Sequence, residues 1–291
     1  MRHSEVNSVD RHFDRLYINV DPRVAQSLQD FRLKNPVKRL VADGVPWEYL
    51  SVGEGENVIL LLHGMAGAYD IWWQQIEALR KHYRIISLTY PLVDNFEAMH
   101  AGINSILHNL GVEHYNVIGT SLGGYLAQYL IARQPERIRC AVFANTYPPN
   151  DLLARRTRSA KVLLRFAPTA LIRLGMDLNT RRSLYPASGR SEILKAYLLE
   201  GARAMRRDIF LARYRCVIQY FDPRPPDGPT PSLLIIESQN DPLISPELRQ
   251  GLKQTYPMAL VHTFGDVGHF SYLHKPEAYI QVLERFLRTS A

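Results

Sequence analysis

A Gly-x-Ser-x-Gly motif at residues 119–123 constrains this chain more than any other feature of its sequence. It follows the apolar run 115–118, and it precedes a helical pattern in which apolar residues recur every three or four positions up to Arg133. Small residues two positions before and after Ser121 allow a sharp turn from a strand into a helix. Such a turn projects the hydroxyl above the sheet, with the positive end of the helix behind it. We therefore interpret Ser121 as a nucleophile, and the alternative is a plain tight turn.

The composition is typical of a globular protein in a reducing compartment. The chain has 291 residues, of which 46% are hydrophobic and 22% charged, enough for one domain with an insertion or for two small domains. Cys140 lies in an apolar run, so we expect a reduced core residue there, whereas Cys216 gives no further signal. Residues 1–10 are polar and no run is long enough to span a bilayer, so we expect a cytoplasmic protein.

The positive charge of the chain is concentrated in one segment. The formal net charge is +7, but residues 151–228 carry 16 Lys and Arg against 7 Asp and Glu, which leaves the remainder at −2. Such a segment suits contact with anionic substrates or with an acidic membrane surface. The alternative, which we favour, is a solvated face on a helical insertion. No recognisable nucleic-acid-binding motif accompanies the charge, so we expect no nucleic-acid partner.

Apolar runs and helical patterns alternate along the chain. Between Arg84 and Ala144 the order strand, helix, strand, helix, strand predicts a parallel sheet with right-handed crossovers. The stretch 147–221 is helical in composition and poor in strands, and the sheet resumes after the proline-rich residues 222–229. We expect strands at 37–41, 47–52, 58–62, 84–88, 115–118, 140–144, 233–237 and 259–264, and helices at 21–31, 71–81, 96–110, 122–133 and 276–287.

A carboxylate and an imidazole follow the last two predicted strands. A serine hydroxyl is a poor nucleophile at neutral pH unless a base lies within hydrogen-bond reach and a carboxylate orients that base. Asp241 follows the run 233–237, and His269 follows the run 259–264. Because the carboxyl ends of parallel strands lie on one edge of the sheet, both side chains can converge with Ser121 there.

Each of these assignments has an alternative. Asp241 precedes a proline and is also suited to cap a turn. Asp266 lies nearer to His269 in the sequence, although neighbours in one loop rarely form the orienting pair. Among the ten histidines we assign the general base to His269, because it alone lies in a Gly-His-Phe loop before the last helix.

The fourth candidate element is the segment His63-Gly64-Met65-Ala66-Gly67, directly after the run 58–62. Acyl transfer needs backbone N–H groups aimed at the developing oxyanion, and we expect those of Met65 and Leu122 to supply them. His63 is expected to support the loop. No metal or organic cofactor is expected, because the histidines do not cluster at ligand spacing. One of Trp72 and Trp73 is expected in the core, and whether the other lines a pocket stays open.

Together these motifs resemble the α/β-hydrolase superfamily from Val37 to Leu287, with the nucleophile, acid and base in the chain order of that superfamily. The resemblance implies an α/β fold with a mostly parallel central sheet flanked by helices. It divides the chain into an N-terminal extension with a short helix (1–36), a hydrolase core (37–146 and 229–291) and an inserted helical cap (147–228). The cap's apolar residues either line an acyl pocket or form the cap's own core, which we favour: Leu163, Leu164, Phe166, Leu171 and Ile172.

Within the superfamily the chain resembles the maspardin-related group at residues 89–91, 125–128 and 144–146. Maspardin is regarded chiefly as an interaction protein and lacks a histidine at the position of His269, so the histidine here favours an enzyme. Two departures stand out. Residues 89–95 lack the common Asp-x-Pro-Gly-x-Gly stretch, and Ser238 replaces the glycine usual three residues before the acid, which weakens the assignment of Asp241.

The sequence therefore predicts a serine hydrolase that acts on a carboxylic ester or related small acyl substrate through an acyl-enzyme. Ser121 is the nucleophile, His269 the base and Asp241 the orienting acid. A C–C bond hydrolase or a small lactonase uses the same three side chains, so the substrate stays open. The alternative from another class is a non-catalytic interaction protein on a hydrolase scaffold. Haloalkane dehalogenases and epoxide hydrolases are disfavoured, because they place an aspartate where this chain has Ser121.

Overall fold

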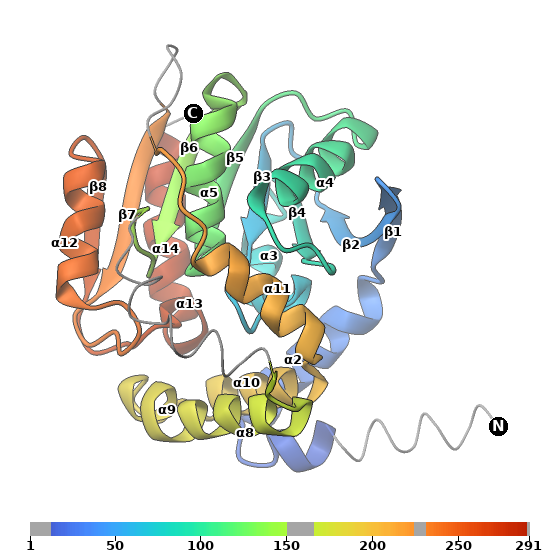
Figure 1. Ribbon diagram of the computed structural model, residues 1–291, viewed down its shortest axis with the longest axis vertical. Coiled ribbons are helices and arrows are strands. Elements are labelled where there is room, and N and C mark those ends of the chain that lie inside the picture. The colour runs from blue at the N-terminus through green and yellow to red at the C-terminus, as the bar shows by residue number, and fades with distance from the viewer. Residues whose placement is uncertain (1–12, 150–165, 224–230, 290–291) are drawn as a thin grey trace.

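A twisted sheet of eight strands crosses the whole protein in the computed structural model, which describes residues 13–149, 166–223 and 231–289 (Figure 1). The strands are β1 (Lys38–Ala42), β2 (Val45–Val52), β3 (Val58–Leu62), β4 (Arg84–Thr89), β5 (Tyr115–Thr120), β6 (Ile138–Ala144), β7 (Ser232–Ser238) and β8 (Leu260–Phe264). Their order is β1-β2-β4-β3-β5-β6-β7-β8. The pairs β1–β2 and β2–β4 are antiparallel, and all other pairs are parallel. The predicted α/β fold with a mostly parallel sheet is confirmed.

Helices cover both faces of this sheet. One face packs against α4 (Phe96–Asn109), α5 (Leu122–Arg133) and α12 (Pro246–Thr255). The other face packs against α2 (Pro22–Lys34), α3 (Trp73–Leu79), α13 (Ser271–His274) and α14 (Pro276–Thr289). Successive residues of a strand point to opposite faces, so the fully buried β3 supplies side chains to both layers.

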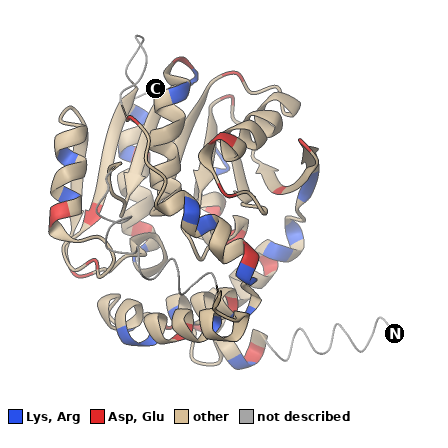
Figure 2. Cartoon of the chain, in the orientation of Figure 1, with Lys and Arg blue, Asp and Glu red and all other residues tan. Residues whose placement is uncertain are grey.

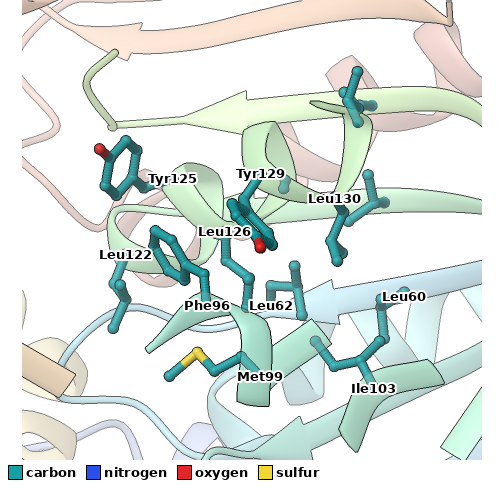
Figure 3. Packing of buried hydrophobic residues seen from close by; sticks show 14 of the residues in the cluster. Leu60, Leu62, Phe96, Met99, Ile103, Leu122, Tyr125, Leu126, Tyr129 and Leu130 are labelled. Carbon is teal, nitrogen blue, oxygen red and sulfur yellow. The ribbon is translucent and has the colours of Figure 1, made fainter. Parts of the chain in front are cut away.

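Figure 3 shows how β3 meets the first of these layers. Leu60 and Leu62 point toward Phe96 and Met99 of α4 and toward Leu126 of α5. The side chains of these five residues are essentially removed from solvent. An element buried on both sides reads as a continuous apolar run, which is why the sequence predicted this strand with its observed bounds.

Two helices differ from the prediction. The helix expected from residue 71 is preceded by a 3₁₀ turn at Tyr69–Trp72, and α3 itself begins at Trp73. Trp72 stacks on Tyr272 with ring centroids 4.3 Å apart, and both tryptophans are buried, so both belong to the core. Helix α12 was not expected, because it contains a glycine and its core-facing residues are only two leucines in an otherwise polar segment.

Between β6 and β7 the described chain forms a layer of helices, here called the insertion (residues 166–223). It contains α8 (Thr169–Asn179), a π-helical turn (Thr180–Leu184), α9 (Tyr185–Ala187), α10 (Glu192–Ala204) and α11 (Arg207–Val217). Helices α8 to α10 lie below the sheet in Figure 1, and α11 runs between them and the sheet. The boundaries of the expected cap stay a prediction, because residues 150–165 and 224–230 lie outside the described residues.

The apolar residues expected to form the cap's own core behave differently from one another. Ile172 is buried, but Leu171 is 57% exposed and Phe166 is 78% exposed. For the latter two the prediction of a core position is wrong, because more than half of each side chain stays in contact with solvent. Leu163 and Leu164 lie outside the described residues.

The basic residues of the insertion are interleaved with acidic ones, as the blue and red segments of α8 to α11 in Figure 2 show. Arg181 pairs with Asp177, and Arg206 pairs with Asp208. Six of the 16 Lys and Arg of the basic segment 151–228 lie outside the described residues, so contact with an anionic surface stays a prediction. In the parts of the chain that the structure describes, no helix has the length and apolar character needed to cross a membrane.

The N-terminal helix α2 is tied to both the core and the insertion. Its N-cap is Asp21, as predicted, and the side chain accepts a hydrogen bond from the Arg23 N–H at 2.8 Å. Arg32 binds Asp70 of the 3₁₀ turn at 2.6 Å and Glu200 of α10 at 2.9 Å. This helix therefore joins the hydrolase core to the insertion.

Substitution of Gly102 tests the packing of α4 on the sheet. Helix propensity alone predicts that Gly102→Ala stabilises the protein by about 1 kcal/mol. A Cβ atom at this position would lie 2.1 Å from the indole of Trp47, so we expect a net loss of about 1–3 kcal/mol instead. Urea unfolding checks this, with Gly175→Ala in α8 as the control, because a Cβ there meets no atom within 4 Å. A gain in stability for both variants would contradict the packing described.

Candidate active site

Ser121 occupies a strained turn between β5 and α5. Its backbone has φ 54° and ψ −120°, a conformation that non-glycine residues rarely adopt. The turn is held on both sides, because the Ser121 N–H donates to Ala144 O at 2.9 Å and Ser121 O accepts from Thr146 Oγ1 at 2.7 Å. A Cβ atom added at Gly119 or Gly123 would lie 2.2 or 2.1 Å from a backbone oxygen. Only glycine therefore allows this close approach of strand and helix.

His269 and Asp241 form a buried pair at the carboxyl edge of β7 and β8. His269 Nδ1 lies 2.8 Å from Asp241 Oδ2 and 3.0 Å from Oδ1, and both side chains are essentially inaccessible. Because a carboxylate only accepts hydrogen bonds, we assign the proton to Nδ1, which leaves Nε2 as the acceptor of the neutral ring. Asp266, the alternative acid, is exposed and makes no hydrogen bond with His269 in the described chain.

Asp241 is held in its ionised form. Burial alone would raise the pKa of this carboxyl, but the charge interaction with His269 and hydrogen bonds from His269, Asn145 and Leu243 lower the pKa below its ordinary value. Asn145 Nδ2 and the Leu243 N–H both lie 2.8 Å from the carboxylate, and the Ile244 N–H lies at 3.1 Å. Asp241 therefore caps the turn before α12 and also binds His269. The two roles that the sequence suggested for it, turn cap and partner of the histidine, are compatible.

Asn145, which the sequence analysis gave no role, anchors this carboxylate. It follows β6 with φ 43° and is buried. Its Nδ2 also donates to Ser238 Oγ at 3.2 Å, and its Oδ1 accepts from Ser271 Oγ at 3.3 Å. Ser238 therefore joins the network around Asp241, and the departure from glycine does not displace the acid. A polar residue directly after a fully apolar strand, at the edge where Ser121 lies, was the signal available for Asn145.

The loop 63–67 lies against the nucleophile. A Cβ atom on Gly64 would be 3.1 Å from Ser121 Cβ. Leu122 is the first residue of α5, where helix N–H groups lack intrahelical acceptors. Among the described residues, neither the Met65 N–H nor the Leu122 N–H donates a hydrogen bond. Both predicted oxyanion donors are therefore available next to Ser121.

His63 supports this loop from inside the protein, as predicted. Its Nδ1 lies 2.6 Å from Gly64 O, and its Nε2 lies 3.3 Å from the Tyr90 N. These partners fit a neutral ring that donates through Nδ1 and accepts through Nε2. Burial, together with the nearby charge of Arg213, holds the pKa of His63 well below its ordinary value. His63 is therefore a neutral structural element of the loop.

Arg213 of α11, in the insertion, binds the same loop by hydrogen bonds. The sequence did not predict a role for this residue. The side chain is buried, and its Nη1 donates to Met65 O at 2.8 Å and to Gly67 O at 3.1 Å. Its Nη2 donates to Tyr90 O at 3.2 Å. In the described chain no carboxylate pairs with it, and burial lowers the pKa of Arg213 to about 10. One more arginine in a basic segment carries no signal of this role, because the burial depends on how α11 packs.

Ser121 and His269 line one pocket of about 170 Å³ beneath the insertion. No hydrogen bond joins their side chains within the described structure, and the pocket is the space that both side chains border. Catalytic hydrogen bonds are often long in structures without substrate. The other lining residues are Gly64, Met65, Ala66, Met176, Asn179, Thr180, Leu184, Leu198, Phe210, Leu243 and Phe270.

A larger cavity of about 580 Å³ lies on the other side of Ala66. Its walls carry several charged side chains, Arg32, Asp70 and Glu200 among them, and it contains neither Ser121 nor His269. The smaller pocket is therefore the candidate active site, because only it brings together the strained serine, the buried histidine and the loop 63–67.

Comparison with known proteins agrees with this arrangement. A family model described as the alpha/beta hydrolase fold matches residues 57–276. The chain belongs to the α/β-hydrolase family. A solved structure of similar shape is the enol-lactonase from Burkholderia xenovorans, with a TM-score of 0.72 at 18% identity, over 86% of this chain and 100% of that one. At this identity the likeness shows the fold alone.

Two curated relatives are similar in sequence. Maspardin of Danio rerio is 28% identical over 138 residues, which is 45% of this chain and 44% of maspardin. A putative carbamate hydrolase of Agrobacterium fabrum is 29% identical over 147 residues, which is 46% of this chain and 54% of that protein. The chain thus spans about half the length of the curated relatives it matches. Maspardin-like relatives within the α/β hydrolases, expected from the sequence, are confirmed.

The neutral state of His63 predicts a pH dependence of stability. Because the pKa of His63 is depressed in the folded protein, its contribution is present above the unfolded pKa of about 6.5 and is lost as the pH falls below it. We expect the free energy of unfolding to fall by about 1.4 kcal/mol per pH unit from this group. Urea unfolding between pH 7.5 and 5 gives the free energy of unfolding as a function of pH. In His63→Gln this free energy should depend less steeply on pH, because one proton fewer is taken up on unfolding. Equal slopes in both proteins would show that the pKa of the ring is not lowered in the folded protein.

Proposed function

We propose that this α/β hydrolase is a serine hydrolase that acts on carboxylic esters or related acyl substrates. The observation that carries the proposal is the buried Asp241–His269 pair, which lines the same pocket as the strained Ser121. A plain tight turn would have no need of a buried imidazole and carboxylate at the same strand edge. Strain of this kind persists only where the surrounding structure maintains it, and it concentrates at functional sites.

In the first half of the reaction Ser121 Oγ attacks the substrate carbonyl while His269 Nε2 takes its proton. The imidazolium formed is stabilised by Asp241, whose lowered pKa keeps it ionised at neutral pH. The hydrogen bonds from Asn145 and Leu243 hold the carboxylate in position, so the ring does not have to reorient during the reaction. Collapse of the intermediate passes the proton from His269 to the leaving alcohol and leaves an acyl-enzyme.

The negative charge that develops on the carbonyl oxygen is received by the N–H groups of Met65 and Leu122. Both are fixed before the substrate arrives, one by the loop 63–67 and the other by the start of α5. Fixed donors of this type contribute more than flexible ones, because they need no reorganisation during the reaction. Water activated by His269 then releases the acid by the same steps in reverse.

The relatives favour an enzyme of the hydrolase class, and the ester substrate is our proposal. The relative from Agrobacterium fabrum is described as a putative carbamate hydrolase. The similarity to maspardin keeps a non-catalytic interaction protein as the alternative from another class. The presence of both His269 and a depressed pKa at Asp241 favours catalysis over this alternative. A C–C bond hydrolase with the same side chains is an outcome of the test below.

The proposal predicts that hydrolysis of p-nitrophenyl acetate depends on Ser121 and His269. Ser121→Ala and His269→Ala should each lower kcat by about 10⁶-fold, and Asp241→Asn by about 10⁴-fold. Asp266→Asn is the matched control and should retain activity, because this exposed acid does not contact His269. A fluorophosphonate reagent should form an adduct that peptide mapping locates at Ser121. Folded protein that neither hydrolyses esters nor labels would favour the interaction protein or a C–C bond hydrolase.

Arg213 is proposed to position the oxyanion loop, and its replacement should act on the rate. Arg213→Lys keeps the charge but loses part of the bonding to three carbonyl groups, so we expect kcat to fall about tenfold with little change in KM. Arg215→Lys, an exposed position on the same helix, is the control. Each kcat is calculated per mole of Ser121 that reacts with the fluorophosphonate, so that inactive protein does not lower it. An unchanged kcat per reactive serine would leave Arg213 with a structural role only.

A further inference from the structure

An apolar groove of about 350 Å³ opens on the insertion beside the candidate active site. Three of its lining residues, Met176, Asn179 and Phe210, also line the pocket that contains Ser121. The two spaces are therefore adjacent, and they meet at side chains from α8 and α11. The remaining residues of the groove are Ala167, Leu171, Ile172 and Gly175.

The groove is suited to hydrocarbon. Among the described residues that line it, none is charged, and Asn179 is the single polar one. Leu171 is 57% exposed there, so its side chain stands in contact with water that an apolar ligand would displace. The cavity on the other side of Ala66 differs, because Arg32, Asp70 and Glu200 line it. An aliphatic chain that extends from Ser121 is therefore expected to bind in the groove beside α8 rather than in the cavity lined by charged residues.

The walls of the groove are fixed relative to each other. Arg207, at the start of α11, donates from Nε to Ala167 O at 2.9 Å. Arg173 of α8 donates from Nε to Met205 O, also at 2.9 Å. These two bonds join α8 and the segment before it to α11 and the segment before that helix.

The floor of the groove is open at Gly175. A Cβ atom at this position would meet no atom within 4 Å, although the residue lies in the middle of α8. Glycine is unfavourable in a helix interior, and no close contact in the described structure requires it here. Its presence leaves space that a side chain would otherwise fill.

The size of the active-site pocket supports the same conclusion. Small-molecule sites typically enclose about 300–1,000 Å³. The pocket at Ser121 has about 170 Å³ and falls below this range, whereas the pocket and the groove together fall within it. A substrate that filled the pocket alone would be small, and the adjoining groove would have no occupant.

We propose that the groove between α8 and α11 binds an aliphatic chain of the substrate, so that the enzyme prefers esters with a long hydrocarbon chain. The chain passes between Met176 and Phe210, and its far end lies against Leu171 and Gly175. This inference rests on the proposed serine hydrolase and deepens it by naming the substrate class.

The first experiment compares p-nitrophenyl esters from acetate to laurate, and acetate esters of alcohols from ethanol to dodecanol. Because each buried methylene contributes up to about a fourfold gain in binding, we expect kcat/KM to rise with chain length in one of the two series. The rise should stop at the length that fills the groove. Two series are used because an ester can carry its long chain on the acid or on the alcohol, and a rise in either supports the proposal.

Variants of α8 test the groove itself. Leu171 lines the groove but not the pocket, so Leu171→Asp should abolish the preference for long chains and leave acetate hydrolysis unchanged. Leu174→Asp is the matched control, because Leu174 lies on the same helix with 53% exposure and does not line the groove. Gly175→Leu should shorten the preferred chain, because the new side chain has room to fill the floor.

The outcomes separate this inference from the proposed function. Wild-type protein that hydrolyses acetate but gains nothing from longer chains would overturn the groove and leave the serine hydrolase intact. The same holds if Leu171→Asp and Leu174→Asp lower long-chain activity equally. Absence of both acetate hydrolysis and Ser121 labelling would reject the proposed function, and the substrate class with it.

Discussion

The close approach of three backbone segments at the Ser121 turn is the constraint on which the rest of the site depends. Because Gly119 and Gly123 have no side chain, the backbone of α5 can lie directly against β5 and against the end of β3. This contact fixes the serine above the sheet and also sets α5 against the loop 63–67. A helix that stood one side chain further out would separate the Leu122 N–H from the loop that carries the Met65 N–H.

Two structural layers contribute to the site in different ways. The sheet edge supplies a polar network in which Asn145 after β6, Asp241 after β7 and His269 after β8 are buried together. Polar groups buried in this way are costly unless each is bonded, so the network specifies one arrangement of the three strand ends. The insertion supplies the apolar pocket wall and Arg213. The charge of Arg213 is offset by carbonyl groups of the loop rather than by a carboxylate.

The sequence predicted those parts that depend on local patterns. Buried strands such as β3 and β7 are continuous apolar runs, and the motif around Ser121 carries its own turn chemistry. The prediction failed where tertiary packing decides. Helix α12 has too few apolar residues for a clear period, Arg213 looks like a surface residue, and Leu171 looks like a core residue although no apolar layer covers it. Asn145 lay within reach of sequence reasoning, because it directly follows the apolar strand β6.

The N-terminal helix has a consequence for the boundaries of the folding unit. The family model matches residues 57–276, yet the buried Asp70 within that range is neutralised by Arg32, which lies outside it. Without Arg32 the Asp70 carboxylate, whose side chain is only 7% exposed, would keep the Tyr197 hydroxyl as a hydrogen-bond donor but lose its cation. The segment that matches the family model therefore depends on a residue outside it to balance a buried charge. A truncation designed on homology alone would leave an uncompensated charge beside the active-site loop.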